Sequence, residues 1–132
     1  MWMSERNWKL RAEEPAAELG TVTLGGDPAG VSLGSERRWI AVYGPGGYCW
    51  RPAAGDRVLV LRAGAEGEVP CVLGRVQEDG GLEPGEARLS GGNCSLHLSR
   101  DGLRLTGSVL VNGKRLEDMI REIAASAPPE GG

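Results

Sequence analysis

The stretch from Glu86 to Val111, EARLSGGNCSLHLSRDGLRLTGSVLV, constrains the fold of this 132-residue chain more than any other feature. Apolar and polar residues alternate along it, and alternation with a period of two predicts β-strands with one apolar face. Turn signals divide it into four short strands, at Gly91-Gly92-Asn93, Asp101-Gly102, Gly107 and Asn112-Gly113. Such short strands cannot bury their apolar faces alone, so they need the rest of the chain or further copies of themselves.

The composition favours one small all-β domain, or a small domain with an appendage. Glycine is abundant, with 22 of 132 residues, which is typical of a chain with many turns. The net charge is −3 and the sequence has no basic block, which disfavours a nucleic-acid partner. Three cysteines, an odd number, do not indicate a disulfide framework.

The sequence predicts neither a membrane helix nor a secretory signal. A membrane helix needs about 18 apolar residues in a row, and no such run occurs. The first residues, MWMSERNWKLRAEE, lack the apolar region of a signal peptide. We therefore expect the protein to be made and kept in a cytosol unless lysis or a dedicated machine releases it.

Residues 19–80 are predicted to form a five-stranded barrel. Five strand patterns with glycine-rich or proline-rich turns occur within these residues, and no long helix interrupts them. The OB-fold is the commonest five-stranded barrel of this size. The predicted strands lie in the segments ELGTVTLGG, VSLG, RRWIAVYG, DRVLVLRA and VPCVLGRVQ.

The two ends of the chain have different patterns from the strands. Residues 1–18 are predicted to be an N-terminal arm, which either packs on its own domain or docks on a partner protein. Residues 113–126 are predicted to be a helix, and residues 127–132 a disordered tail. The helix has an apolar stripe at positions i, i+3, i+4 and i+7. These positions are Leu116, Met119, Ile120 and Ile123.

Three stretches together resemble the baseplate spike proteins of contractile phage tails and related injection machines. The first, IAVYGPGGYCWRPAAGDRVLVLRAG at 40–64, is similar to the family's tyrosine-glycine loop and RPxxGDxVxVL pattern. The second is GEVPCVLGRV at 67–76. The third, LEPGEARLSGGNCSLHLSRDGLRLTGSVLVNGKRLEDMI at 82–120, resembles the family's pGE turn, short strands and closing vxvNGkxL. The group includes the phage Mu-type baseplate spike and baseplate assembly protein V.

The resemblance implies an OB-fold followed, at residues 81–112, by an intertwined trimeric β-prism or β-helix that forms a needle. It implies a structural, non-enzymatic homotrimer in the baseplate of a phage tail, prophage tail or tailocin. Such a trimer caps the tail tube, contacts the hub and tube proteins, and transmits force for envelope penetration. Three copies would share a core made of Leu89, Leu96, Leu98, Leu103, Leu105, Val109 and Val111. The expected interface anchors are Trp2, Trp8, Trp39 and Tyr48.

The chain departs from the spike pattern at its C-terminal end. Pointed members of the family carry a His-x-His that holds iron at the tip, whereas the single histidine here is His97, in the middle of the needle segment. An amphipathic helix follows the needle instead. We therefore expect a blunt spike base, with a separate tip protein or effector at this end.

Catalytic and metal sites are not favoured by the sequence, and we expect no cofactor. Cys94 and His97 are three residues apart, so a strand would point them to opposite faces. A zinc site would need Cys49, Cys71, Cys94 and His97, which lack the usual paired spacing. Small buried cysteines are the simpler explanation. A ring of three His97 side chains around a trimer axis is a further possibility, although the alternation places His97 outward.

Two groups of charged residues flank the strands. Glu83, Glu86 and Arg88 form one, and residues 115–122 contain the other. The simplest interpretation of both is solvated surface, and pairing between chains of a trimer is the alternative.

An alternative function is a monomeric OB-fold module that binds single-stranded nucleic acid. Such modules use exposed aromatic side chains and a basic groove. Aromatic residues do cluster in the barrel segment, although they could equally belong to its core or to an interface. The aromatic and basic residues concerned are Arg37, Arg38, Trp39, Tyr43, Tyr48, Trp50, Arg51 and Arg57.

Overall fold

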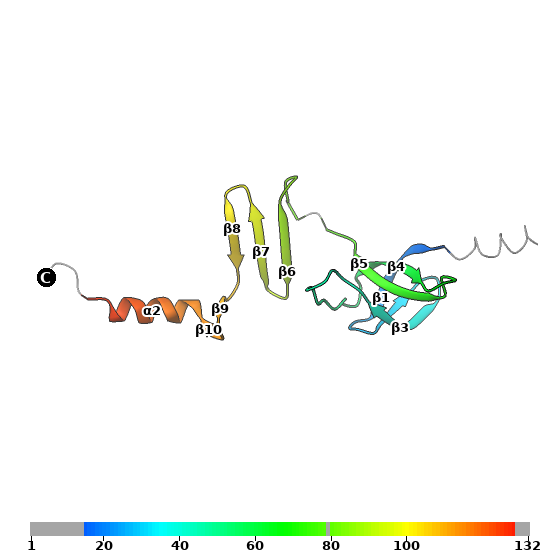
Figure 1. The fold of residues 1–132 in the computed structure, drawn as a ribbon, viewed down its shortest axis with the longest axis horizontal. Coiled ribbons are helices and arrows are strands. Elements are labelled where there is room, and N and C mark those ends of the chain that lie inside the picture. Colours follow the sequence, from blue (N-terminus) through cyan, green and yellow to red (C-terminus); the bar gives the residue numbers. More distant parts are fainter. Residues whose placement is uncertain (1–14, 79, 129–132) are drawn as a thin grey trace, which may run out of the picture. The chain divides into compact units, whose positions relative to one another are not determined.

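The computed structural model describes residues 15–78 and 80–128, and the chain divides into two compact units after Glu78 (Figure 1). Most of the predicted N-terminal arm, including Trp2 and Trp8, lies outside the described residues. The end of the predicted tail also lies outside them. Within the described residues, no helix is both long and apolar enough to cross a membrane.

The first unit is a closed, OB-like barrel of five strands, as the sequence predicts. The strands follow one another around the barrel in the order β1, β2, β3, β5 and β4. β3 and β5 run parallel, and the other neighbouring pairs run antiparallel. The strands are β1 (Ala17–Leu24), β2 (Ala29–Ser32), β3 (Glu36–Val42), β4 (Arg57–Ala63) and β5 (Val69–Arg75).

The barrel interior is filled by small and branched aliphatic side chains. In β4, Val58 and Val60 are buried whereas Leu59 and Leu61 are partly exposed, which is the alternation of a strand with one inward face. β-Branched side chains suit the pleated wall of a barrel because they pack closely against their neighbours. The core consists of Val22, Ala29, Val31, Ile40, Val58, Val60 and Val72.

The second unit contains a three-stranded antiparallel sheet, a two-stranded hairpin and a helix (Figure 1). The sheet consists of β6 (Ala87–Gly91), β7 (Cys94–Ser99) and β8 (Gly102–Thr106) in sequence order. The hairpin pairs β9 (Leu110–Val111) with β10 (Lys114–Arg115). The helix is α2 (Leu116–Ser126). The protein is therefore mostly β, with small antiparallel sheets after the barrel and one described helix at the C-terminal end.

The helix begins at Leu116, three residues later than the predicted helical segment begins. Asn112 and Gly113 have positive φ angles of 51° and 81°, which are the angles of a tight hairpin turn. Lys114 and Arg115 therefore pair back onto β9 before the helix can start. At the other end, Ala127 is extended because it precedes Pro128, and the helix ends before it.

Candidate interaction surfaces

The sheet β6–β7–β8 carries all its leucines on one face. Residues that lie directly opposite one another on neighbouring strands share a face. Leu96 lies opposite both Leu89 and Leu105, and Leu98 lies opposite both Ala87 and Leu103. The face thus consists of two cross-strand rows of three apolar residues. Four of its five leucines are more than half exposed: Leu89 is 56% exposed, Leu98 51%, Leu103 57% and Leu105 52%.

Val109 and Val111, which the sequence groups with these leucines, lie beyond the three-stranded sheet. Val111 belongs to β9, and Val109 accepts a hydrogen bond of 2.9 Å from the backbone N–H of Leu116. Both valines therefore support the hairpin and the start of the helix. The predicted alternation is thus present in the sheet as far as Thr106, where β8 ends.

The opposite face of the same sheet is polar. Arg88, His97 and Arg104 form one cross-strand row, and Ser90, Ser95 and Thr106 form the next. Cys94 lies opposite Gly91 in the register and His97 opposite Arg88, so Cys94 and His97 project from opposite faces. Among residues 15–78 and 80–128, no cluster of three histidine, cysteine or acidic residues could hold a metal ion. All three cysteines are free thiols.

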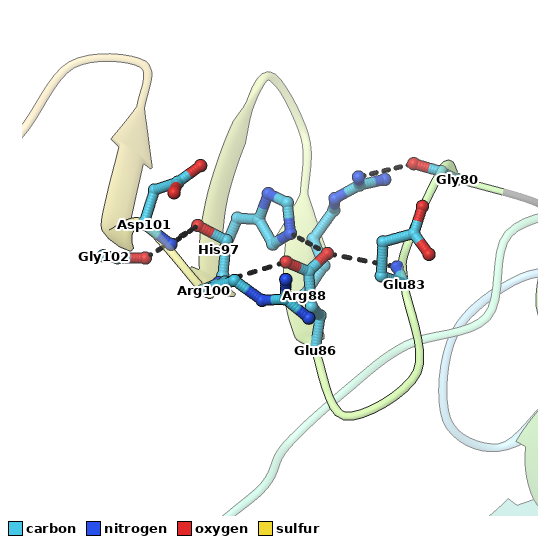
Figure 2. A network of polar contacts seen from close by, with 9 residues as sticks. Gly80, Glu83, Glu86, Arg88, His97, Arg100, Asp101 and Gly102 are labelled. Atoms are coloured by element: carbon cyan, nitrogen blue, oxygen red, sulfur yellow. Dashed lines mark hydrogen bonds and ion pairs between the residues drawn. The ribbon is translucent and has the colours of Figure 1, made fainter.

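Glu86 organises the turn that leads into the sheet (Figure 2). Its Oε1 atom accepts a hydrogen bond of 3.1 Å from the backbone N–H of Glu83. Its Oε2 atom accepts one of 3.2 Å from the N–H of Arg100. The Nε2 atom of His97 lies 3.4 Å from Oε1. The interpretation of this charged group as solvated surface is wrong for Glu86, whose side chain is only 15% exposed.

The environment of Glu86 favours its charged form. The N–H groups of Glu83 and Arg100 hold the pKa of the Glu86 carboxyl below its usual value of 4.5; burial opposes this shift, and His97 lowers the pKa by a smaller amount. Arg88 belongs to the same region and donates a hydrogen bond from Nη2 to the carbonyl of Gly80 (Figure 2). These contacts fasten the segment before β6 to the sheet. The EPGE sequence signals a turn, but nothing local in it indicates that Glu86 reaches Arg100.

Trp39 is the most exposed large hydrophobic side chain that the structure describes on the barrel. It is 84% exposed, and its φ angle of 61° lies in the left-handed region. The register between β2 and β3 explains this positive φ. Ala29 pairs with Ile40 and Val31 pairs with Arg37, so a step of two residues along β2 corresponds to a step of three along β3. Trp39 therefore lies in a β-bulge, where glycine is the usual residue at a positive φ. The possibility that Trp39 belongs to the barrel core is excluded by its exposure.

The other aromatic residues of the barrel divide between surface and core. Tyr43 and Tyr48 are 54% and 60% exposed. Trp50 is half-buried and packs against the core, and its indole N–H donates a hydrogen bond of 3.0 Å to the carbonyl of Tyr43. The surface candidates among the predicted aromatic residues are therefore Trp39, Tyr43 and Tyr48, whereas Trp50 stabilises the loop between β3 and β4.

The helix α2 presents a third apolar surface. None of its residues is buried, and Leu116, Ile120 and Ile123 are 37%, 58% and 67% exposed. The sheet, the bulge at Trp39 and this helix are thus the surfaces on which a function can be based.

No protein-family model matches the chain, and no curated protein matches it. The observations that bear on function are therefore the OB-like barrel, the small antiparallel sheets, the C-terminal helix and the exposed surfaces of these elements.

Proposed function

We propose that this chain is a structural baseplate spike or central-hub protein of a contractile phage tail, prophage tail or tailocin. It works as a homotrimer that caps the tail tube and transmits force for envelope penetration. It is not an enzyme. It is assembled in the bacterial cytoplasm and remains in the tail particle, where it contacts hub and tube proteins and, at its C-terminal end, a separate tip protein.

The observation that carries this proposal is the leucine face of β6–β7–β8. Two cross-strand rows of apolar residues lie on one face, and four of the five leucines in them are at least 51% exposed. Contiguous exposed apolar surface of this kind marks an interaction site. Three copies that turn this face toward a common axis form a prism with a shared core. The order of a barrel followed by short strands also agrees with the architecture that the resemblance to baseplate spikes implies.

The polar face supports the same arrangement. Arg88, His97 and Arg104 lie side by side on it, and burial of three basic side chains in a trimer core would be unfavourable. This face is therefore directed to solvent in the prism. A core made by three chains cannot be opened from one end without separating all of them, which suits a part that transmits force.

The test is the mass of the full chain in solution, measured by light scattering at micromolar concentration. We expect about three times the mass of one chain, as for a closed cyclic trimer. The mass should persist in moderate urea, because separation of the chains exposes the leucine face. A monomer at these concentrations would contradict the proposal.

A second candidate function, a monomeric module for single-stranded nucleic acid, is favoured by the exposure of Trp39. Arg37 and Arg38 precede it on β3 and are also exposed. An exposed aromatic ring beside basic side chains can stack on a base and contact its phosphate. Fluorescence anisotropy with an oligothymidine at two salt concentrations tests this function. Binding that weakens with salt and is lost in Trp39→Ala, by a monomeric chain, would favour it over the spike.

A further inference from the structure

None of the residues in the apolar stripe of α2 is buried within the described part of the chain. The helix has 11 residues, and isolated helices shorter than about 12 to 15 residues are marginal in water. Its contacts with the rest of the unit include the hydrogen bond from the Leu116 N–H to Val109, its packing on β10, and the ion pair between Glu122 and Lys114. Ile120 and Ile123 lie further along and are the most exposed of the stripe. A stable α2 therefore requires another surface to cover the stripe.

We propose that the partner of α2 is α2 of the other two copies, so that three helices form a short coil after the prism. The proposal rests on the homotrimer proposed above and adds a second contact to it. The stripe residues are Leu116, Met119, Ile120 and Ile123.

The spacing of the stripe suits packing between identical helices. Leu116, Met119 and Ile123 are separated by three and then four residues, which is the a–d–a spacing of a coiled coil. Ile120 lies next to Met119 and widens the stripe, as expected for a bundle with more than two helices. About one and a half heptads are too few to associate alone.

The prism supplies what this short coil lacks. Each helix follows the sheet of its own chain after residues 107–115, which include the short β9–β10 hairpin, so assembly of the sheets brings three α2 helices together. Because the helices are tethered to the assembled sheets, the effective concentration of each α2 helix near the other two is in the millimolar range. A partner protein has no such advantage, which favours a second copy as the occupant of the stripe.

The charges around α2 also fit a self-contact. Lys114 pairs with Glu122, and Arg121 Nη1 lies 3.8 Å from Asp118 Oδ1. Residues 114–126 contain three basic residues (Lys114, Arg115, Arg121) and three acidic residues (Glu117, Asp118, Glu122), so their net charge is zero. Copies of a neutral segment do not repel one another, and the segment offers no charge bias toward an acidic or a basic partner.

The leucine face holds the copies together, but it is smaller than the interfaces of most stable assemblies. It contains six apolar residues per chain, whereas stable interfaces commonly use about 20 to 30 residues per side. A helix coil would add contact area at the end of the prism. The helix α2, which follows the sheet in the chain, can supply this additional contact area.

The test is hydrogen exchange of the α2 amides in the full chain, together with its mass by light scattering. In the wild-type trimer we expect exchange of residues 119–126 to be slowed at least about 100-fold relative to an unstructured peptide. Ile123→Glu places three charges in the coil and should remove most of this protection while the mass remains that of a trimer. Glu117→Gln, which changes the exposed polar face, should leave the protection unchanged.

The outcomes separate the two proposals. A wild-type trimer with unprotected α2, or with protection that Ile123→Glu does not reduce, would overturn the helix coil and leave the spike proposal standing. Protection that persists in a monomeric Leu98→Asp chain would show that α2 folds back on its own chain, which also overturns the coil. A monomeric wild-type chain would instead contradict the homotrimer itself.

Discussion

The Oε1 atom of Glu86 lies 3.4 Å from the Nε2 atom of His97, which joins the turn before β6 to the middle of β7. The same carboxylate accepts hydrogen bonds from the N–H groups of Glu83 and Arg100, so it also reaches the turn between β7 and β8. One side chain thus connects three points of the second unit. Because none of its partners lies on the leucine face, this network holds the sheet together independently of any contact between copies.

The second unit should lose stability in acid through Glu86. Its pKa is lowered in the folded protein, mainly by the N–H groups of Glu83 and Arg100. Its stabilising contribution is therefore complete above the pKa of the unfolded chain and is lost as the pH falls through the lower, folded pKa. Thermal unfolding between pH 6 and pH 2.5, followed by circular dichroism, should show this loss in the wild type. Glu86→Gln should be less stable at pH 6 and should show a smaller change with pH; an unaltered pH profile would argue against the network.

The two faces of the sheet should differ sharply in their tolerance of charge. Leu98 lies between Ala87 and Leu103 on the apolar face, and Arg104 lies opposite His97 on the polar face. Leu98→Asp should reduce the mass of the assembly about threefold, to that of one chain, because an unpaired carboxylate in a shared core is costly. Arg104→Asp should retain the trimer. Light scattering on both variants decides the matter, and equal tolerance of the two changes would mean that the faces are assigned wrongly.

The sequence predicts which side chains share the apolar face of the sheet β6–β7–β8, because this depends only on neighbouring residues. Alternation and the turn signals at Asp101-Gly102 are properties of neighbouring residues, and they determine which side chains share a face. The barrel strand β4 follows from the same reasoning, since Val58 and Val60 are buried and alternate with partly exposed positions. In the α2 region, the hairpin turn at Asn112-Gly113 prevails over the helical pattern at residues 113–115.

The network of Glu86 and the backbone of Trp39 could not be predicted from local patterns. Glu86 contacts Arg100, which is 14 residues away in the sequence, and the contact exists only once β6 and β7 are paired. The positive φ of Trp39 results from a mismatch of register with β2. Neither feature has a periodicity, because each depends on how two segments meet.

The bulge at Trp39 should be more stable with glycine than with alanine. A residue with a Cβ atom in the left-handed region destabilises the fold by about 1–2 kcal/mol, and glycine avoids this cost. Part of that gain in stability is lost because glycine has more conformational entropy in the unfolded chain. We expect Trp39→Gly to exceed Trp39→Ala by about 1 kcal/mol in the free energy of unfolding. Both variants lack the indole ring, so the comparison isolates the backbone. Urea unfolding measures it, and a Trp39→Ala variant as stable as Trp39→Gly would show that the bulge is unstrained.

The barrel should be sensitive to an added methyl group at Gly20. A Cβ atom there would lie 2.5 Å from Val31 Cγ1 and 2.6 Å from Leu33 Cδ2; Val31 belongs to the core, and Leu33 packs against it. Overpacking of this kind typically costs about 1–3 kcal/mol, and we expect Gly20→Ala to lower the free energy of unfolding by that amount.

Gly74, on β5, is the matched control, because a Cβ atom there would meet no atom within 4 Å. Gly74→Ala should change stability by less than about 0.5 kcal/mol. Urea unfolding followed by tryptophan fluorescence measures both variants, since Trp50 packs on the barrel core. Equal stability of the two would mean that β1 and β2 do not approach as closely at Gly20 as their packing indicates.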